Sequence, residues 1–287
     1  MKIKKKRNAR SNSPVVSKGT AFPFQVSVTC WVDLLGYGSM ISQANYNPLN
    51  DTSNLAVARI EKFHQLIAQH TNRYFPALIL NDGAVIYRDL SLRSRSVTYD
   101  FFVRCFRLFE DINDLENQNN FPGARMILAA GFRLRKRPIK VVSHHNKSIL
   151  RRYREGRITA EEAIHEAAKS RDFAESIPEL QSNFAFTKSY VADTDGTKGG
   201  LVGPNFYVDD LLFSSIPTWL IKEDLVHWKN EKLKLSASFV PVISIDKCNH
   251  PSGGPTEIRS GLEVAQILSD DPNVLSALRS KGKLRDQ

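Results

Sequence analysis

A short turn between two apolar runs determines much of how this chain can fold. Residues 75–80 and 84–87 are mainly apolar, and Asn81, Asp82 and Gly83 separate them. A tight hairpin turn needs residues that tolerate a positive φ, so this pattern predicts a β-hairpin. Because hairpin strands run antiparallel, we expect the chain to build a largely antiparallel sheet around residues 75–87.

A further strand is predicted before the hairpin. In residues 25–33, QVSVTCWVD, apolar residues alternate with polar or aromatic ones, which is the period of two typical of a strand. The strand ends at Asp33, and Gly36 and Gly38 follow shortly after it. We interpret residues 34–53 as a polar loop and turn region.

A helix is predicted between this strand and the hairpin. Residues 55–70 repeat apolar positions at helical spacing, so one face of the helix is expected to cover the sheet. That face is predicted to hold Ala56, Ile60, Phe63 and Ile67. The residue that caps the helix is expected among Asp51, Thr52, Ser53 and Asn54.

The rest of the chain alternates predicted helices and strands. Helices are expected at about 98–116, 158–170, 179–193 and within 257–280, and strands at 124–135, 205–213 and 238–245. Thr159 is predicted to cap the second of these helices. Residues 195–203 are glycine-rich and are interpreted as a connection, while residues 136–178 are interpreted as a helical insertion.

These elements predict an α+β fold in which helices flank a mainly antiparallel sheet. We expect a single domain over residues 21–287, preceded by a basic disordered tail at residues 1–20.

The composition is that of a globular protein, with 41% hydrophobic and 24% charged residues in a chain of 287. No apolar run reaches the ~20 residues of a membrane-spanning helix, and the basic N-terminus is not followed by the apolar segment of a secretory signal. The cysteines, Cys30, Cys105 and Cys248, are scattered and odd in number. This favours a reducing compartment, so we expect a soluble cytoplasmic protein without a membrane partner.

The net charge of +10 raises the question of a nucleic-acid partner. Six of the 40 basic residues fall in the first ten positions, and others cluster at 133–137 and 151–157. Most aromatic residues lie inside apolar segments rather than among the basic ones, so a stacking surface for nucleic acid is not indicated. Nucleic-acid binding stays open as an alternative with little support.

Two aspartates are the candidate chemical groups. If the strand at 25–33 lies beside the hairpin, Asp33 at the strand end and Asp82 in the turn meet at one edge of the sheet. Paired carboxylates there suit Mg²⁺ or Mn²⁺, which prefer oxygen ligands and leave room for phosphates. Turn chemistry alone also explains Asp82, and a strand end alone explains Asp33.

The combination resembles the class III nucleotide cyclases, in residues 31–38 (WVDLLGYG) and 80–87 (LNDGAVIY). The resemblance implies the ferredoxin-like catalytic-domain fold of that family, and two Mn²⁺ or Mg²⁺ ions held by Asp33 and Asp82 with help from the Leu34 carbonyl. It further implies a phosphate-binding segment made of Leu35, Gly36, Tyr37, Gly38 and Ser39. The implied reaction converts a nucleoside triphosphate to a 3′,5′-cyclic monophosphate and pyrophosphate, in a homodimer with shared active sites.

Departures from the family pattern indicate a subgroup. Purine-specific members carry a lysine before the second aspartate, where this chain has PALIL, and the helical segment NFAFTKSYVAD lacks the family's arginine. Lys188 and Tyr190, with Asn183 as a further candidate, would have to serve in its place, and Arg88 is a candidate phosphate contact. The chain is similar in this to the pyrimidine cyclases of the Pycsar anti-phage systems, which implies UTP or CTP as substrate and a base contact from Tyr37.

The main alternative is a catalytically degenerate cyclase-like domain that binds a nucleotide or a partner without turnover. The missing arginine favours this alternative, whereas the presence of both aspartates favours catalysis.

Overall fold

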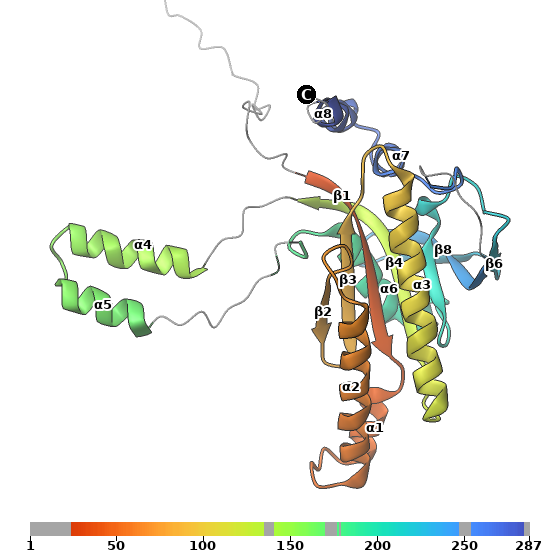
Figure 1. Ribbon diagram of the computed structural model, residues 1–287, viewed down its shortest axis with the longest axis horizontal. Coiled ribbons are helices and arrows are strands. Elements are labelled where there is room, and N and C mark those ends of the chain that lie inside the picture. Colours follow the sequence, from red (N-terminus) through yellow and green to blue (C-terminus); the bar gives the residue numbers. More distant parts are fainter. Residues whose placement is uncertain (1–23, 135–140, 170–176, 178, 247–253, 284–287) are drawn as a thin grey trace, which may run out of the picture.

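The computed structural model describes residues 24–134, 141–169, 177, 179–246 and 254–283 (Figure 1). The predicted tail at residues 1–20 lies outside the described residues, as do residues 136–140, 170–176 and 178 of the predicted insertion and residue 135 of the predicted strand.

The core of the fold is one eight-stranded sheet in the order β2-β3-β1-β4-β5-β8-β6, with β7 paired to β8. The strands are β1 Phe24–Leu34, β2 Ala77–Leu80, β3 Gly83–Asp89, β4 Ala124–Leu134, β5 Phe206–Asp209, β6 Leu220–Lys222, β7 Val226–Asn230 and β8 Leu235–Ile245. Only the β4–β5 pairing is parallel among the described strands. The predicted α+β class and mainly antiparallel sheet are confirmed.

The first four strands form the predicted ferredoxin-like unit. The hairpin is confirmed: Leu80 pairs with Gly83, and Asn81 takes a φ of +56° in the turn between them. The connection from β1 to β2 carries α1 Tyr37–Gln43 and α2 Asp51–His70, and α3 Arg95–Gln118 connects β3 to β4. These connections place β1 in the middle of the unit, hydrogen-bonded to β3 and β4.

Helices cover both faces of the sheet. On one face, α2, α3, α7 Gly261–Leu268 and α8 Pro272–Lys283 contribute to one apolar cluster with the alternate β1 residues Val26, Val28, Cys30 and Val32. On the other face lies α6 Phe184–Asp195, so close to β4 that a Cβ on Gly131 would lie 2.6 Å from the backbone nitrogen of Ala185. The insertion contributes α4 Val141–Arg154 and α5 Ala160–Lys169, and Thr159 caps α5 as predicted.

Several predicted boundaries were wrong. Residues 34–53 contain α1 rather than only loop, and α2 is capped by Asn50, whose side chain accepts a hydrogen bond from the Thr52 N–H at 2.8 Å. The strand predicted at 205–213 ends at Asp209, because that side chain accepts from the Leu211 N–H and turns the chain into a short 3₁₀ segment. Strands β6 and β7 were not predicted. No helix in the described part of the chain is both long and apolar enough to cross a membrane.

A buried ion pair joins the two long helices. Arg59 of α2 occupies the core-facing stripe with Ala56 and Phe63, where Ile60 was predicted, and is 2% exposed. Its guanidinium forms a two-pronged pair with Glu116 of α3, also 2% exposed. The aromatic ring of Phe121 lies 4.7 Å from the guanidinium carbon. Each charge is therefore satisfied only by the other and by its few polar neighbours.

We expect Arg59→Met to lower the free energy of unfolding by about 3–5 kcal/mol, because it leaves the Glu116 carboxylate buried without its partner. The double variant Arg59→Met/Glu116→Leu should recover most of this loss, since both charges are then removed. Urea denaturation measures both. Lys229→Met, which breaks the exposed pair with Glu231, is the control and should change stability by less than about 1 kcal/mol. Equal effects at Arg59 and Lys229 would contradict this account.

Candidate active site

The structure brings Asp33 and Asp82 to the same edge of the sheet. Asp33 of β1 lies opposite Gly83 in the β1–β3 register, and the Leu34 N–H donates to the Asp82 carbonyl at 3.0 Å. The strand end and the hairpin turn are thus joined by the main chain. Each carboxylate lies close enough to the other for Asp82 to raise the pKa of Asp33.

The loop after Asp33 is held by contacts from three sides. Besides the Leu34 bond, the Leu35 N–H donates to the Gly123 carbonyl at 2.9 Å, and the Leu35 carbonyl accepts from Arg59 at 2.9 Å. Gly36 then takes a φ of +76°, and a Cβ there would lie 3.2 Å from Pro122. Both the backbone conformation and the close neighbour favour glycine at this position.

The start of α1 beyond this loop is open. Nothing lies within 4 Å of where a Cβ on Gly38 would be, and Ser39 is exposed. Tyr37 is half-buried near Asp82: burial and the Asp82 charge together raise the pKa of its phenol. The loop is therefore fixed at Leu34 and Leu35, and open to a ligand at Gly38 and Ser39.

Asp33 lies in a strongly anionic setting. Burial above all, together with the charges of Asp193 and Asp82, raises its pKa to about 7 against the opposing effect of Arg125 and Arg59. Burial is the largest cause of this shift, and the two neighbouring carboxylates add to it. A bound cation would offset both effects, so the donor set fits a divalent metal ion.

A buried network beside Asp33 holds the third carboxylate. Asp193 of α6 accepts from Arg125 at 2.6 Å and from the Trp31 indole N–H at 3.0 Å. The same guanidinium donates to the Leu201 carbonyl at 3.1 Å and to the Asp193 carbonyl at 3.0 Å. Arg125 faces Asp33 across the β1–β4 pairing, yet its hydrogen bonds go to Asp193 and Leu201. Within the described residues, neither Asp33 nor Asp82 has an ion pair with a basic side chain.

The described residues hold no group of three or more His, Cys, Asp or Glu side chains arranged as a complete metal site. An ion at Asp33 and Asp82 would therefore take its other ligands from backbone carbonyls, water or a phosphate. Mg²⁺ and Mn²⁺ bind in this way when a phosphorylated substrate is present.

Two predicted site residues lie away from the aspartates. Arg88 pairs with Val28, five residues along β1 from Asp33, which is about 16 Å. Its guanidinium binds Asp100 of α3 at 2.7 Å. Lys188 is buried and binds Asp209 at 2.8 Å, and that carboxylate also accepts from the Ala130 N–H, five residues along β4 from Arg125. The structure does not bring either side chain to Asp33.

Tyr190 and Asn183, the other predicted residues of α6, have different surroundings. The Tyr190 ring is 46% exposed and lies edge-on to Trp31, with ring centroids 5.0 Å apart. Trp31 is two residues before Asp33 on the same side of β1, so Tyr190 is on the site's face of the sheet. Asn183 caps α6 by accepting from the Phe186 N–H, which is a structural role.

Sequence reasoning missed Arg59, Arg125 and Asp193. Arg59 had a usable signal, because it stands three residues after Ala56 and four before Phe63, within the core-facing stripe of a predicted helix. Arg125 and Asp193 gave no such signal: one opens a strand and the other lies at the end of a helix about 70 residues later, and only the fold brings them together.

No known family model matches the sequence, and no curated protein matches it. Solved structures do resemble it. The adenylyl cyclase CyaB from P. aeruginosa is 7% identical with a TM-score of 0.48, covering 79% of this chain and 98% of that one. The guanylyl cyclase Cya2 is 11% identical with a TM-score of 0.43, covering 82% and 100%.

The guanylate cyclase domain of RhGC from Catenaria anguillulae, solved in complex with GTP, is 10% identical with a TM-score of 0.39, covering 77% of this chain and 98% of that one. At these identities and TM-scores the likeness adds nothing to the functional case, which rests on the residues of the site.

The raised pKa of Asp33 predicts that Asp33→Asn stabilises the metal-free protein above pH 7. Between the ordinary value of 3.8 and the folded value of about 7, the folded state holds a proton that the unfolded state releases, so wild-type stability falls as pH rises. Asparagine does not ionise, so the variant does not lose stability in this way as the pH rises. After discounting for water near the carboxylate, we expect a gain of roughly 1–3 kcal/mol at pH 8, or about 2–4 °C in Tm per kcal/mol.

Thermal unfolding in EDTA at pH 5 to 8.5 measures this difference, which should grow up to about pH 7 and then level off. Asp224→Asn, at an exposed carboxylate, is the control and should leave Tm unchanged. A variant that is no more stable than wild type at pH 8 would show that Asp33 carries no ionisation penalty.

Proposed function

We propose that this protein is a nucleotide cyclase that converts a nucleoside triphosphate to its 3′,5′-cyclic monophosphate and pyrophosphate. The observation that carries the proposal is the juxtaposition of Asp33 and Asp82 beside a fixed, glycine-containing loop. Two carboxylates from a strand end and a hairpin turn, with excess negative charge, are what a site for two Mg²⁺ or Mn²⁺ ions requires.

In this proposal Asp33, Asp82 and the Leu34 carbonyl hold the metal ions, and residues 35–39 lie along the phosphates. When bound, the metal ions neutralise the triphosphate and the charge that develops in the transition state. The ribose 3′-hydroxyl gives up its proton to water and its oxygen attacks the α-phosphorus, the new P–O bond closes the ring, and the bond to the β-phosphate breaks to release pyrophosphate. The fixed Leu34–Gly36 backbone supplies positioning, which is the protein's main contribution to phosphoryl transfer.

The finer proposal is that the substrate is UTP or CTP and that the product is a second messenger in anti-phage defence. Its support is the resemblance to the Pycsar cyclases and the apolar PALIL segment before Asp82. We assign the base contact to Tyr37, the half-buried first residue of α1, and Tyr190 stays a candidate for stabilising the transition state. We further propose a homodimer with shared sites, because the resemblance implies one.

A second candidate, binding of a nucleotide without turnover, is favoured by one observation. Lys188, which would replace the family's arginine, is held by Asp209 in a buried pair. If no other cation reaches the transition state, the site would bind a nucleotide and a metal ion but not complete the reaction.

The test is to incubate the purified protein with Mn²⁺ and ATP, GTP, CTP or UTP separately and to identify products by mass spectrometry. We expect a cyclic monophosphate and pyrophosphate from UTP or CTP. Asp33→Asn and Asp82→Asn should each reduce turnover by at least about a hundredfold while leaving the protein folded, because each removes a metal ligand. Asp224→Asn is the control and should keep full activity.

The outcomes separate the candidates. Turnover of a purine nucleotide instead would keep the cyclase proposal and overturn the pyrimidine one. Nucleotide and Mn²⁺ binding by calorimetry without any product would favour the degenerate domain. Full activity in either aspartate variant would overturn the metal site.

A further inference from the structure

The helical insertion between β4 and α6 is a hairpin without a core of its own. Figure 1 shows α4 and α5 side by side and standing apart from the sheet and its covering helices. Of the hairpin side chains that the structure describes, Ile149 alone is buried, at 4% exposed. Isolated helices shorter than about 12–15 residues are marginal in water, and α4 and α5 have 14 and 10 residues. The hairpin therefore needs a further surface to pack against.

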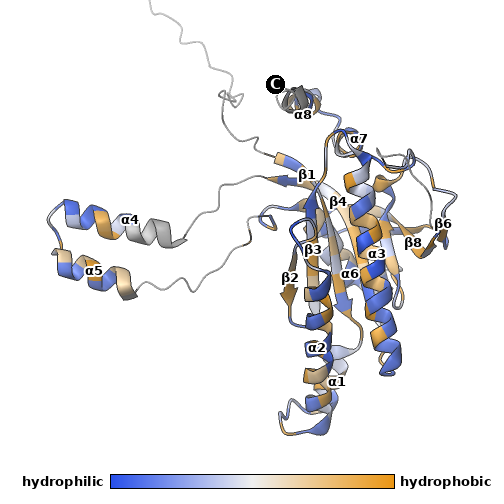
Figure 2. Ribbon diagram, viewed as in Figure 1, coloured by the Kyte–Doolittle hydropathy of each residue, from blue (hydrophilic) through white to orange (hydrophobic). Residues whose placement is uncertain are grey.

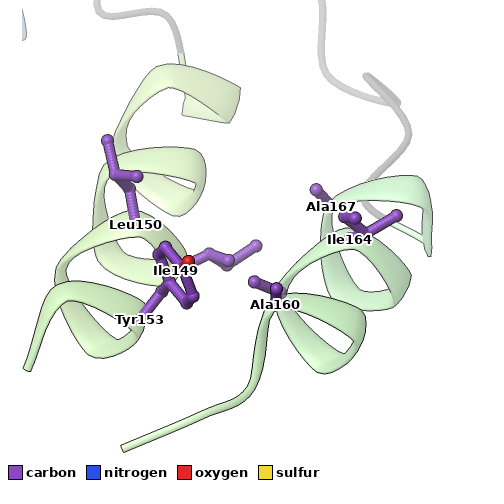
Figure 3. Close-up of a pocket in the computed structure, with 7 residues that line it drawn as sticks. Ile149, Leu150, Tyr153, Ala160, Ile164 and Ala167 are labelled. Carbon is purple, nitrogen blue, oxygen red and sulfur yellow. The ribbon is translucent and has the colours of Figure 1, made fainter. Parts of the chain in front are cut away.

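An apolar groove runs between the two helices (Figure 3). It has a volume of about 380 Å³ and is lined only by apolar or aromatic residues: Ile149, Leu150, Tyr153, Ala160, Ala163, Ile164 and Ala167. Three large side chains at its rim are exposed, Leu150 at 45%, Tyr153 at 46% and Ile164 at 69%. Figure 2 shows orange bands on α4 and α5 between hydrophilic ones. Such a patch marks an interaction surface rather than a solvent-facing one.

The two helices of the hairpin carry charges of mainly opposite sign. From residue 147 to 154, α4 carries Lys147, Arg151, Arg152 and Arg154 and no acidic residue. Helix α5 carries Glu161, Glu162 and Glu166, and its one lysine or arginine is Lys169 at its last position. Within one hairpin the two sets attract each other, as the Arg152–Glu166 pair shows.

This pattern is complementary to itself. We propose that the hairpins of two copies of the chain pack groove to groove and form a four-helix bundle. A two-fold axis through the grooves places each basic α4 against the acidic α5 of the other copy, so the apolar rims are buried and the charges alternate around the bundle. A nucleic acid or an anionic membrane would instead favour a face of one sign, which this hairpin does not present.

The proposal does not depend on the cyclase chemistry, and it is tested without nucleotide. Sedimentation equilibrium of the full chain over a range of concentrations gives the dimer dissociation constant. We expect Leu150→Gln/Ile164→Gln to raise this constant by at least about tenfold, because two apolar side chains per copy lose their burial. Both substitutions are at exposed helical positions, so the fold is preserved. Leu233→Gln, at a residue 50% exposed in the β7–β8 turn, is the matched control and should leave the constant unchanged.

A charge exchange identifies the partner as a second copy. Arg151→Glu/Arg154→Glu lowers the net charge of residues 147–154 from +4 to zero, so α4 no longer attracts an acidic α5, and Glu161→Lys/Glu162→Lys makes α5 basic beside a basic α4. Each variant alone should associate more weakly than wild type, whereas an equimolar mixture should form heterodimers by native mass spectrometry. Complementary charges are restored only between two different chains.

Three results would overturn the proposal. If the dimer dissociation constant is unchanged by all these substitutions, the two copies associate through another surface. A monomer whose hairpin amides are protected from hydrogen exchange would show that the same chain covers the groove. A monomer whose hairpin amides exchange without protection would indicate that the groove binds a different partner.

Discussion

The register of β1 between β3 and β4 is the constraint on which the site depends. Along β1, alternate residues enter the core against α2 and α3, and the residues between them face α6. Because the side-chain period of a strand is two, a shift by one residue would turn Asp33 into the core and Val32 out of it. The apolar set that includes Val28 and Val32 thus fixes Asp33 beside the hairpin turn and opposite Arg125.

That register also creates an electrostatic imbalance. Burial raises the pKa of Asp33 and of Asp193, and the charge of Asp82 adds to both shifts, while the hydrogen bonds of Arg125 are directed to Asp193 and Leu201. Burial of a carboxylate without a compensating charge destabilises a fold. A chain that keeps such a cluster at a sheet edge keeps an unfavourable feature of its metal-free state, and this feature is the same one that favours a divalent ion.

The parts of the fold that local patterns specify were predictable from the sequence. The Asn81–Gly83 turn and the alternation in residues 25–33 gave the hairpin, the first strand and, from their order, the meeting of Asp33 with Asp82. Local patterns could not place site residues whose surroundings are set by residues far away in the sequence. Lys188 looked available until the fold placed Asp209 against it, and Arg88 looked close to Asp82 in sequence although an extended strand carries it about 16 Å away. Strand β7, VHWKN, has too few apolar residues to signal a strand, and it forms because β8 offers it an edge.

The positions of the arginine side chains near Asp33 limit how the site can bind a triphosphate. In the described part of the chain, the arginines that influence Asp33 are Arg59 and Arg125, and both are occupied: Arg59 by Glu116 and the Leu35 carbonyl, Arg125 by Asp193 and Leu201. Their role is to hold the loop and the third carboxylate in place. In the function proposed above, the charge of a bound triphosphate would then be met mainly by metal ions at the aspartates. Among the described residues, a site rich in fixed carboxylates whose nearby arginines are occupied suits a metal-loaded nucleotide better than a free one.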